Sequence, residues 1–261
     1  MKKYGLITIG VTLSICVGAP LSLYLGVAYA NQRQKAIVSS EKQQYGELYD
    51  YMLTTQAGRP LTAPISNKAL KVVTNNFSDA EKQEIVNAID RLDNIIDNVN
   101  YEILDSDGKN IYADIYIYND ADNNINQQSV GDVHTLGVTH FTYDERTAKI
   151  NYPLTITIDS NCSKYYDSTG VSLLNYVVKH EMMHTLGFAD LYDEKYYNKS
   201  VMWHAVEGDV NDYTSLDEFN LKTLYDNNLV KIVNNNNNKI LNNNIISVYP
   251  VTKKKENNME K

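Results

Sequence analysis

The feature that most constrains this chain is a pair of histidines at the end of an apolar helical pattern. Apolar residues recur at helical spacing just before the pair, namely Leu173, Leu174, Val177 and Val178. His180 and His184 follow, and residues four apart lie on one face of a helix, so both imidazoles can reach one metal ion. Glu181 stands beside the first histidine, where a carboxylate can take a proton from water bound to the metal. The spacing therefore predicts a hydrolytic metal site on one helix.

The cysteine count limits which ligands are available. The chain has two cysteines, Cys16 and Cys162, and the first lies in a segment that export can remove. Neither a disulfide framework nor a four-thiolate zinc site can be built from them. Any metal must therefore be held by histidines and carboxylates, and Cys162 is expected to be a small buried hydrophobe.

A glycine and an aspartate extend the motif. Gly187 comes three residues after His184, and glycine permits the left-handed turn that ends a helix and reverses the chain. We expect this reversal to bring Asp190 back to the metal. An aspartate oxygen binds zinc at about 2.0–2.2 Å and makes the site one charge more negative than a third histidine would.

The complete array, His180-Glu181-x-x-His184-x-x-Gly187-x-x-Asp190, resembles the metzincin clan of zinc endopeptidases. Aspartate replaces the usual third histidine, as it does in the snapalysin-like members of the clan. The resemblance implies one catalytic zinc ion (Zn2+), bound by His180, His184 and Asp190. It also implies that Glu181 is the general base and that the substrate is a protein or peptide.

Residues beyond the motif extend the resemblance to the methionine turn of metzincins. Ser200-Val201-Met202-Trp203 lies where this turn is expected, with Met202 placed 12 residues after Asp190. His204 is the second residue after Met202, the position at which astacins and serralysins carry a tyrosine that helps to stabilise the oxyanion. His204 is therefore either a catalytic hydrogen-bond donor or a packing partner of Trp203.

The pattern of the remaining chain predicts an α+β fold. Short apolar runs predict about five strands, at 70–73, 101–104, 112–118, 136–142 and 154–158. Capping boxes predict two helices, one beginning at Ser78 and one at Thr214. The first of these helices carries an apolar stripe of Ile85, Ile89, Leu92 and Ile96.

Resemblance to matrixins organises these elements into a metzincin-like zincin catalytic domain. It implies a twisted five-stranded mixed sheet, a backing helix, an active-site helix and a small C-terminal subdomain, over about residues 66–230. Residues 113–117 resemble the third strand of matrixins, and residues 136–138 resemble the approach to their substrate-lining edge strand.

The N-terminal residues predict export. Residues 1–30 begin with Lys2 and Lys3, continue without charge and end in Ala28-Tyr29-Ala30, so they are interpreted as a signal peptide or signal anchor. The protein is therefore expected to be extracellular, either secreted or anchored to the outer face of the cell membrane.

Three further segments follow the export segment. Residues 31–66 are polar without an apolar period and predict a linker or short pro-segment. Residues 67–230 are the expected catalytic domain. Residues 231–261, rich in asparagine and lysine, predict a low-complexity tail.

Charge limits the partners. The chain has 24 basic and 32 acidic residues, a formal charge of -8, so nucleic acid is not expected as a partner. Membrane contact is expected only through the N-terminal segment if it is uncleaved, and the protein is expected to be a monomer. Residues 119–126 alternate oxygen ligands, but Ile125 stands where a calcium loop needs glycine, so Ca2+ is not supported and a solvated loop is expected.

Three alternatives remain open. A gluzincin-type peptidase would use a downstream glutamate, Glu207 or Glu218, as the third ligand. A zinc hydrolase could act on a non-peptide bond, because metal chemistry alone does not name a substrate. The third alternative is a catalytically silent zinc-containing surface binding protein. His134 and His140 are left without a role.

Overall fold

The computed structural model describes residues 21–64, 68–104, 111–122, 124–126, 133–166, 170, 172–206, 210–226, 244–248 and 252–254. The first 20 residues of the expected export segment, most of the expected tail and the candidate ligand Glu207 lie outside the described residues. No helix in the part of the chain that the structure describes is long and apolar enough to cross a membrane.

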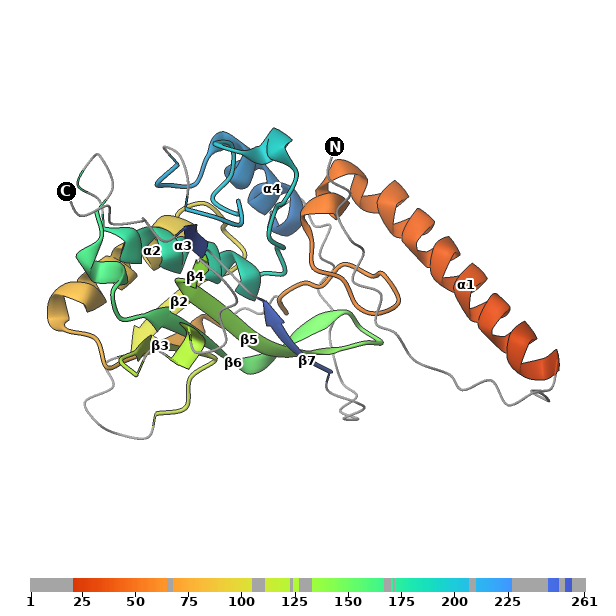
Figure 1. The fold of residues 1–261 in the computed structure, drawn as a ribbon, viewed down its shortest axis with the longest axis horizontal. Coiled ribbons are helices and arrows are strands. Elements are labelled where there is room, and N and C mark those ends of the chain that lie inside the picture. The colour runs from red at the N-terminus through yellow and green to blue at the C-terminus, as the bar shows by residue number, and fades with distance from the viewer. Residues whose placement is uncertain are drawn as a thin grey trace, which may run out of the picture.

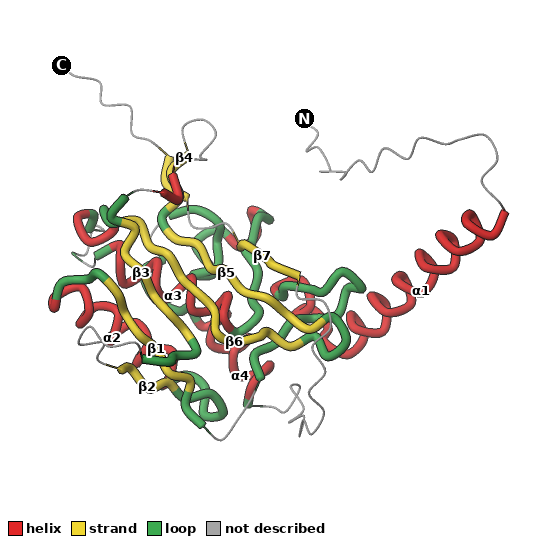
Figure 2. The backbone as a smooth tube through the Cα atoms, turned by 90° about the horizontal axis from the view of Figure 1, so that it is seen from below, coloured by secondary structure: helices red, strands yellow, loops and turns green. Residues whose placement is uncertain are grey.

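A mixed six-stranded sheet forms the centre of this α+β protein (Figures 1 and 2). Its order is β2-β1-β3-β6-β5-β7. The four strands from β2 to β6 are mutually parallel, whereas β5 is antiparallel to β6 and β7 is antiparallel to β5. The strands are β1 (Leu70–Asn75), β2 (Tyr101–Leu104), β3 (Ile115–Asp120), β5 (Gly137–Asp144), β6 (Lys149–Asp159) and β7 (Asn244–Val248).

The five expected strands are confirmed, and the expected sheet gains β7 at its edge. The expected low-complexity tail supplies this strand, and it supplies a second one in a separate two-stranded sheet. That sheet pairs β4 (Val133–Thr135) with β8 (Thr252–Lys254). Both tail strands escape prediction because their partners lie more than 100 residues away and no local pattern indicates the pairing.

Two helices cover one face of the sheet (Figure 1). They are α2 (Asp79–Asp93) and α3 (Leu173–Thr185), and they pack against each other. The expected capping box of α2 is present, with Ser78 and Glu81 exchanging side-chain and backbone hydrogen bonds. Its apolar stripe, including Ile85, Ile89 and Leu92, is fully buried.

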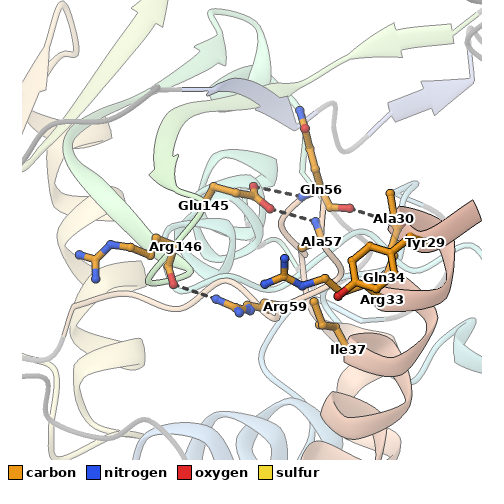
Figure 3. A pocket seen from close by; sticks show the side chains of 10 residues that line it. All are labelled: Tyr29, Ala30, Arg33, Gln34, Ile37, Gln56, Ala57, Arg59, Glu145 and Arg146. Carbon is orange, nitrogen blue, oxygen red and sulfur yellow. Dashed lines mark hydrogen bonds between the residues drawn. The ribbon is translucent and has the colours of Figure 1, made fainter. Parts of the chain in front are cut away.

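The remaining helices lie outside this layer. They are α1 (Leu21–Tyr45) and α4 (Ser215–Tyr225), with short 3-10 turns η1 (Gly46–Tyr51), η2 (Asn124–Asn126), η3 (Cys162–Lys164) and η4 (Glu194–Tyr196). Helix α1 extends away from the body of the molecule (Figure 1). Near its inner part a hollow of about 540 Å³ lies between α1 and the β5–β6 turn, where Glu145 accepts hydrogen bonds from the backbone of Gln56 and Ala57 (Figure 3).

Residues 46–63 of the expected linker or short pro-segment pack against the rest of the fold. Leu48, Tyr51, Met52, Leu61 and Ala63 are buried in the core, in a 3-10 turn and an irregular extended segment that produce no regular apolar period. The backbone of this segment bonds the chain just after α3, because the Leu53 N–H donates to Gly187 O at 2.8 Å. We name residues 46–63 the N-terminal clasp. The part of the expected linker from residue 46 to residue 63 therefore belongs to the folded domain.

Candidate metal centre

Helix α3 carries the histidine motif through the interior of the molecule. Its residues are buried from Leu173 to Thr185, with the exception of Asn175, so the motif is held by packing along its whole length. The helix ends at Thr185, and Gly187 just beyond it has a φ of +95°, the left-handed conformation that the sequence predicts. A Cβ atom at this position would lie 2.1 Å from the carbonyl oxygen of Leu61 in the N-terminal clasp. Glycine is therefore required both for the turn and for the approach of the clasp.

The two histidines are oriented by backbone carbonyl groups. His180 Nδ1 lies 2.8 Å from Val201 O, and His184 Nδ1 lies 2.8 Å from Phe188 O. A carbonyl oxygen only accepts hydrogen bonds, so each Nδ1 carries a proton and Nε2 is the ring nitrogen left for a metal ion. This is the tautomer in which metal-binding histidines use Nε2.

The free nitrogens converge with the carboxylate of Asp190. The two Nε2 atoms are 3.1 Å apart, and Asp190 Oδ1 lies 3.0 Å from that of His180 and 3.6 Å from that of His184. Tetrahedral ligands at about 2.0–2.2 Å from zinc are separated from one another by about 3.3–3.5 Å. The donor set present therefore fits a tetrahedral metal ion with one position left for another ligand.

Glu181 lies beside this group on a different face of α3. His180, Glu181 and His184 form a buried group that can hold a metal ion. Glu181 Oε2 accepts a hydrogen bond of 2.7 Å from the hydroxyl of Thr139 on β5, whereas its Oε1 has no hydrogen-bond partner although it is buried. A buried oxygen without a partner is costly and calls for water, a metal or a ligand.

The electrostatics follow from this crowding of charges. Burial raises the pKa of the Glu181 carboxyl, and the two imidazoles oppose it. Burial lowers the pKa of His184, but the carboxylates of Asp190 and Glu181 outweigh this effect and raise it to about 9. The imidazoles hold the pKa of Asp190 well below its usual value, against its burial. His184 and Asp190 therefore stabilise each other's charged forms in the interior.

The predicted turn around Met202 is fully buried and anchored beside the histidines. Met202 is 1% exposed, and its carbonyl accepts the N–H of Leu191 directly after Asp190. The neighbouring residue Val201 provides the carbonyl that bonds His180. The turn thus joins the second half of the motif to His180.

Asp217 on α4 fixes this turn, a role that sequence reasoning missed. Its carboxylate accepts hydrogen bonds from the Ser200 hydroxyl at 2.5 Å and from the Val201 N–H at 2.9 Å. It also accepts from Thr214, and it is 1% exposed. The sequence indicated only the capping box of α4, in which Asp217 is the third helical residue. The Asp217 carboxylate therefore both caps α4 and holds the turn around Met202.

His204 lies in an aromatic row next to the site. Its ring stacks on Tyr192 with centroids 4.7 Å apart and contacts Trp203 at 4.5 Å. The Tyr192 hydroxyl is the polar group of this row that lies beside Asp190. Burial and this carboxylate raise the pKa of Tyr192 to about 12. Sequence reasoning did not single out Tyr192, although its position two residues after Asp190 was a signal.

The other candidate residues lie elsewhere. Glu218 forms an ion pair with Arg91 at 2.5 Å, and Cys162 is fully buried as expected. His134 lies 2.6 Å from Asp159, and His140 is half-buried on β5. In the expected solvated loop, Asp120 accepts hydrogen bonds from Asn124 and Ile125.

Comparison with known proteins adds no family to these observations. No family model matches the chain, and no curated protein matches it.

Proposed function

We propose that this protein is a zinc-dependent endopeptidase of the metzincin type. The observation that carries the proposal is the convergence of two imidazole nitrogens and the Asp190 carboxylate, with a buried glutamate beside them. Two neutral imidazoles and one carboxylate leave one coordination position open, which is the pattern of catalytic rather than structural zinc sites.

His180, His184 and Asp190 would hold the zinc ion. When bound, zinc would supply Lewis acidity and lower the pKa of a water molecule toward about 7. The carbonyl groups of Val201 and Phe188 keep both Nε2 atoms free for this task. Asp190 adds a negative charge that offsets part of the charge of the ion.

Glu181 would be the general base. Its Oε1 is free to accept a proton from the attacking water, while Thr139 holds Oε2 in place. The raised pKa of Glu181 suits a group that accepts this proton and then passes it from Oε1 to the leaving amine.

Three features of the fold support the metzincin-type assignment. Of the five expected strands, only β5 is antiparallel to its neighbour β6. Strand β5 follows β6 in the sheet order, and its residue Thr139 bonds Glu181. A methionine lies in a buried turn bonded to the first ligand and to the chain after Asp190. The chain also reverses at Gly187 with a positive φ.

We propose a protein or peptide as the substrate, and the support is that a strand next to Glu181 can align an extended chain. We further propose that the protein acts outside the cell, secreted or surface-anchored. The support is the N-terminal sequence, with two lysines, an uncharged stretch and a small-x-small ending.

Cleavage of a mixed protein substrate by the zinc-loaded full chain tests the proposal. Glu181→Ala should retain zinc and lose nearly all turnover, and a chelator should abolish cleavage by the native chain. Glu102→Ala is the matched control, because Glu102 is an exposed glutamate on β2. Full activity in Glu181→Ala would refute the mechanism. Bound zinc without cleavage of any substrate would favour the silent binding protein instead.

Metal content distinguishes the third ligand. Asp190→Ala should weaken zinc binding strongly, whereas Glu207→Ala and Glu218→Ala should leave it unchanged. Glu218 is held by Arg91, which argues against it as a ligand. Zinc loss in Glu207→Ala with retention in Asp190→Ala would establish the gluzincin alternative.

A further inference from the structure

The outer edge of β5 is covered by a strand from the end of the chain. Strand β7 pairs antiparallel with β5 from Thr139, opposite Val248, to Tyr143, opposite Asn244 (Figure 2). Strand β8 pairs antiparallel with β4, from Val133 opposite Lys254 to Thr135 opposite Thr252. Both tail strands therefore follow the same stretch of chain, residues 133–143.

The two pairings share one register. Val248 and Thr252 are four residues apart, and so are their partners Thr139 and Thr135. A segment that paired at two unrelated places would have no reason to keep this spacing. We name the two tail strands, residues 244–248 and 252–254, the tail strap.

The strap pairs with a β5 residue that bonds the proposed general base. Thr139, which is opposite Val248, is the residue that donates a hydrogen bond to Glu181 Oε2. Gly137 lies two residues before Thr139 in β5, and a Cβ atom there would be 2.7 Å from Glu181 Oε1. The edge that the strap covers is therefore the edge beside Glu181.

A sheet edge accepts one strand at a time. Its outward N–H and C=O groups bind an extended peptide by adding it to the sheet, with affinity from the main-chain hydrogen bonds. A substrate aligned along β5 would need the same groups that now bond β7. The strap and the substrate are thus mutually exclusive on this edge.

We propose that the tail strap is an internal competitor that occupies the substrate-binding edge of this protein. The proposal rests on the proposed peptidase function. Because the strap is tethered to α4 through residues 226–243, its effective concentration at the edge reaches the millimolar range. The β5 edge is available to a substrate only when the strap is displaced. In the resting protein, the C-terminal residues therefore limit substrate binding.

Proline substitution in the full chain tests the strap directly. Alternate residues of a strand direct their N–H groups to the same neighbour, so one of Ile245 and Ile246 donates toward β5. The double variant Ile245→Pro/Ile246→Pro removes that donor in either phase. Asn236→Pro/Asn237→Pro is the matched control, because it places two prolines in the asparagine run before β7.

Hydrogen exchange reports the pairing and kinetics report the competition. We expect the amides of Thr139–Tyr143 that face β7 to exchange about tenfold faster in the Ile245/Ile246 double variant, because the edge opens. We expect KM for a peptide substrate to fall about tenfold with kcat nearly unchanged, because competition affects binding rather than chemistry. Unchanged exchange would overturn the proposal, and so would faster exchange with unchanged KM.

A binding measurement separates this proposal from the proposed function. A labelled peptide with the sequence of residues 244–254 should bind the Ile245/Ile246 double variant about tenfold more tightly than it binds the native chain. Equal binding would overturn the proposal. A difference in binding, together with no cleavage by any of the chains, would refute the peptidase function and still support the strap.

Discussion

The two sides of helix α3 are built differently. On the ligand side, both histidines bond backbone carbonyl groups. One of these carbonyls belongs to Val201, and the Asp217 carboxylate accepts a hydrogen bond from the N–H of the same residue. On the base side, Glu181 has one oxygen bonded to Thr139 and one without a partner. The ligand side is thus fully constrained by protein, whereas the base side has an unused hydrogen-bonding capacity.

This difference corresponds to two chemical tasks. Metal ligands must stay within a fraction of an ångström of their geometry, which requires supporting hydrogen bonds. A general base must accept and release a proton, so one of its oxygens must be free to face water and substrate. If the assignment is right, damage to the ligand side should appear as lost metal and stability, and damage to the base side as lost turnover.

Metal removal should give the largest effect on stability. Zinc at about 1,000 times its Kd stabilises the folded state by about 4 kcal/mol, and a chelator removes this contribution. Thermal unfolding with and without chelator measures it. A chelator-treated native chain that unfolds at the same temperature as the zinc-loaded chain would contradict a metal centre in α3.

Gly187→Ala should destabilise the protein by more than about 3 kcal/mol. The new Cβ would meet the Leu61 backbone at 2.1 Å, and the φ of +95° is unfavourable for alanine. Gly170→Ala is the control, because Gly170 has φ +85° with no atom within 4 Å of the new Cβ. That control should cost only about 1–2 kcal/mol. Equal losses in denaturant unfolding would show that the approach of the clasp does not matter.

Asp217→Ala should cost about 3 kcal/mol and weaken zinc binding. It leaves the buried donors Ser200 and Val201 without an acceptor, and this releases the turn that bonds His180. The neighbouring Glu218→Ala removes a partly exposed ion pair with Arg91 and should cost less than about 1 kcal/mol. Unchanged zinc affinity in Asp217→Ala would show that the turn does not contribute to zinc binding.

Thr139→Val addresses the base side. The substitution removes the hydroxyl that holds Glu181 Oε2, so kcat should fall about tenfold while zinc content stays the same. Thr155→Val, on the neighbouring strand β6, is the control and should leave kcat unchanged. Loss of zinc in Thr139→Val would mean that Glu181 serves the ligand side after all.

His204→Phe should have the smallest effect. His204 stacks on Tyr192 and contacts Trp203, and phenylalanine can preserve these ring contacts. We expect kcat to change by less than about twofold. A loss of about 100-fold or more would instead identify His204 as an oxyanion donor.

Much of this molecule could be predicted from local patterns in the sequence. The five strands, the capping boxes of α2 and α4 and the turn at Gly187 each follow from residues that are neighbours in the chain. The approach of Asp190 to both histidines could also be predicted from neighbouring residues, because Asp190 follows the chain reversal at Gly187 by only three residues.

What escaped prediction depends on distant contacts. The N-terminal clasp has no periodicity because its residues are ordered by the chain after α3 rather than by their own pattern. Strand β7 lies in a polar, asparagine-rich context, and only the β5 edge makes it a strand. The acceptor role of Asp217 toward Val201 was hidden because its capping role already explained the residue.

The most direct test of the central claim is a crystal structure of the zinc-loaded full chain, with the metal located by its anomalous scattering. We predict one peak about 2.0–2.2 Å from His180 Nε2, His184 Nε2 and an Asp190 oxygen. Glu181 should lie beside the metal and not coordinate it. A peak bound by Glu181 in place of Asp190, or no peak at α3, would contradict the account.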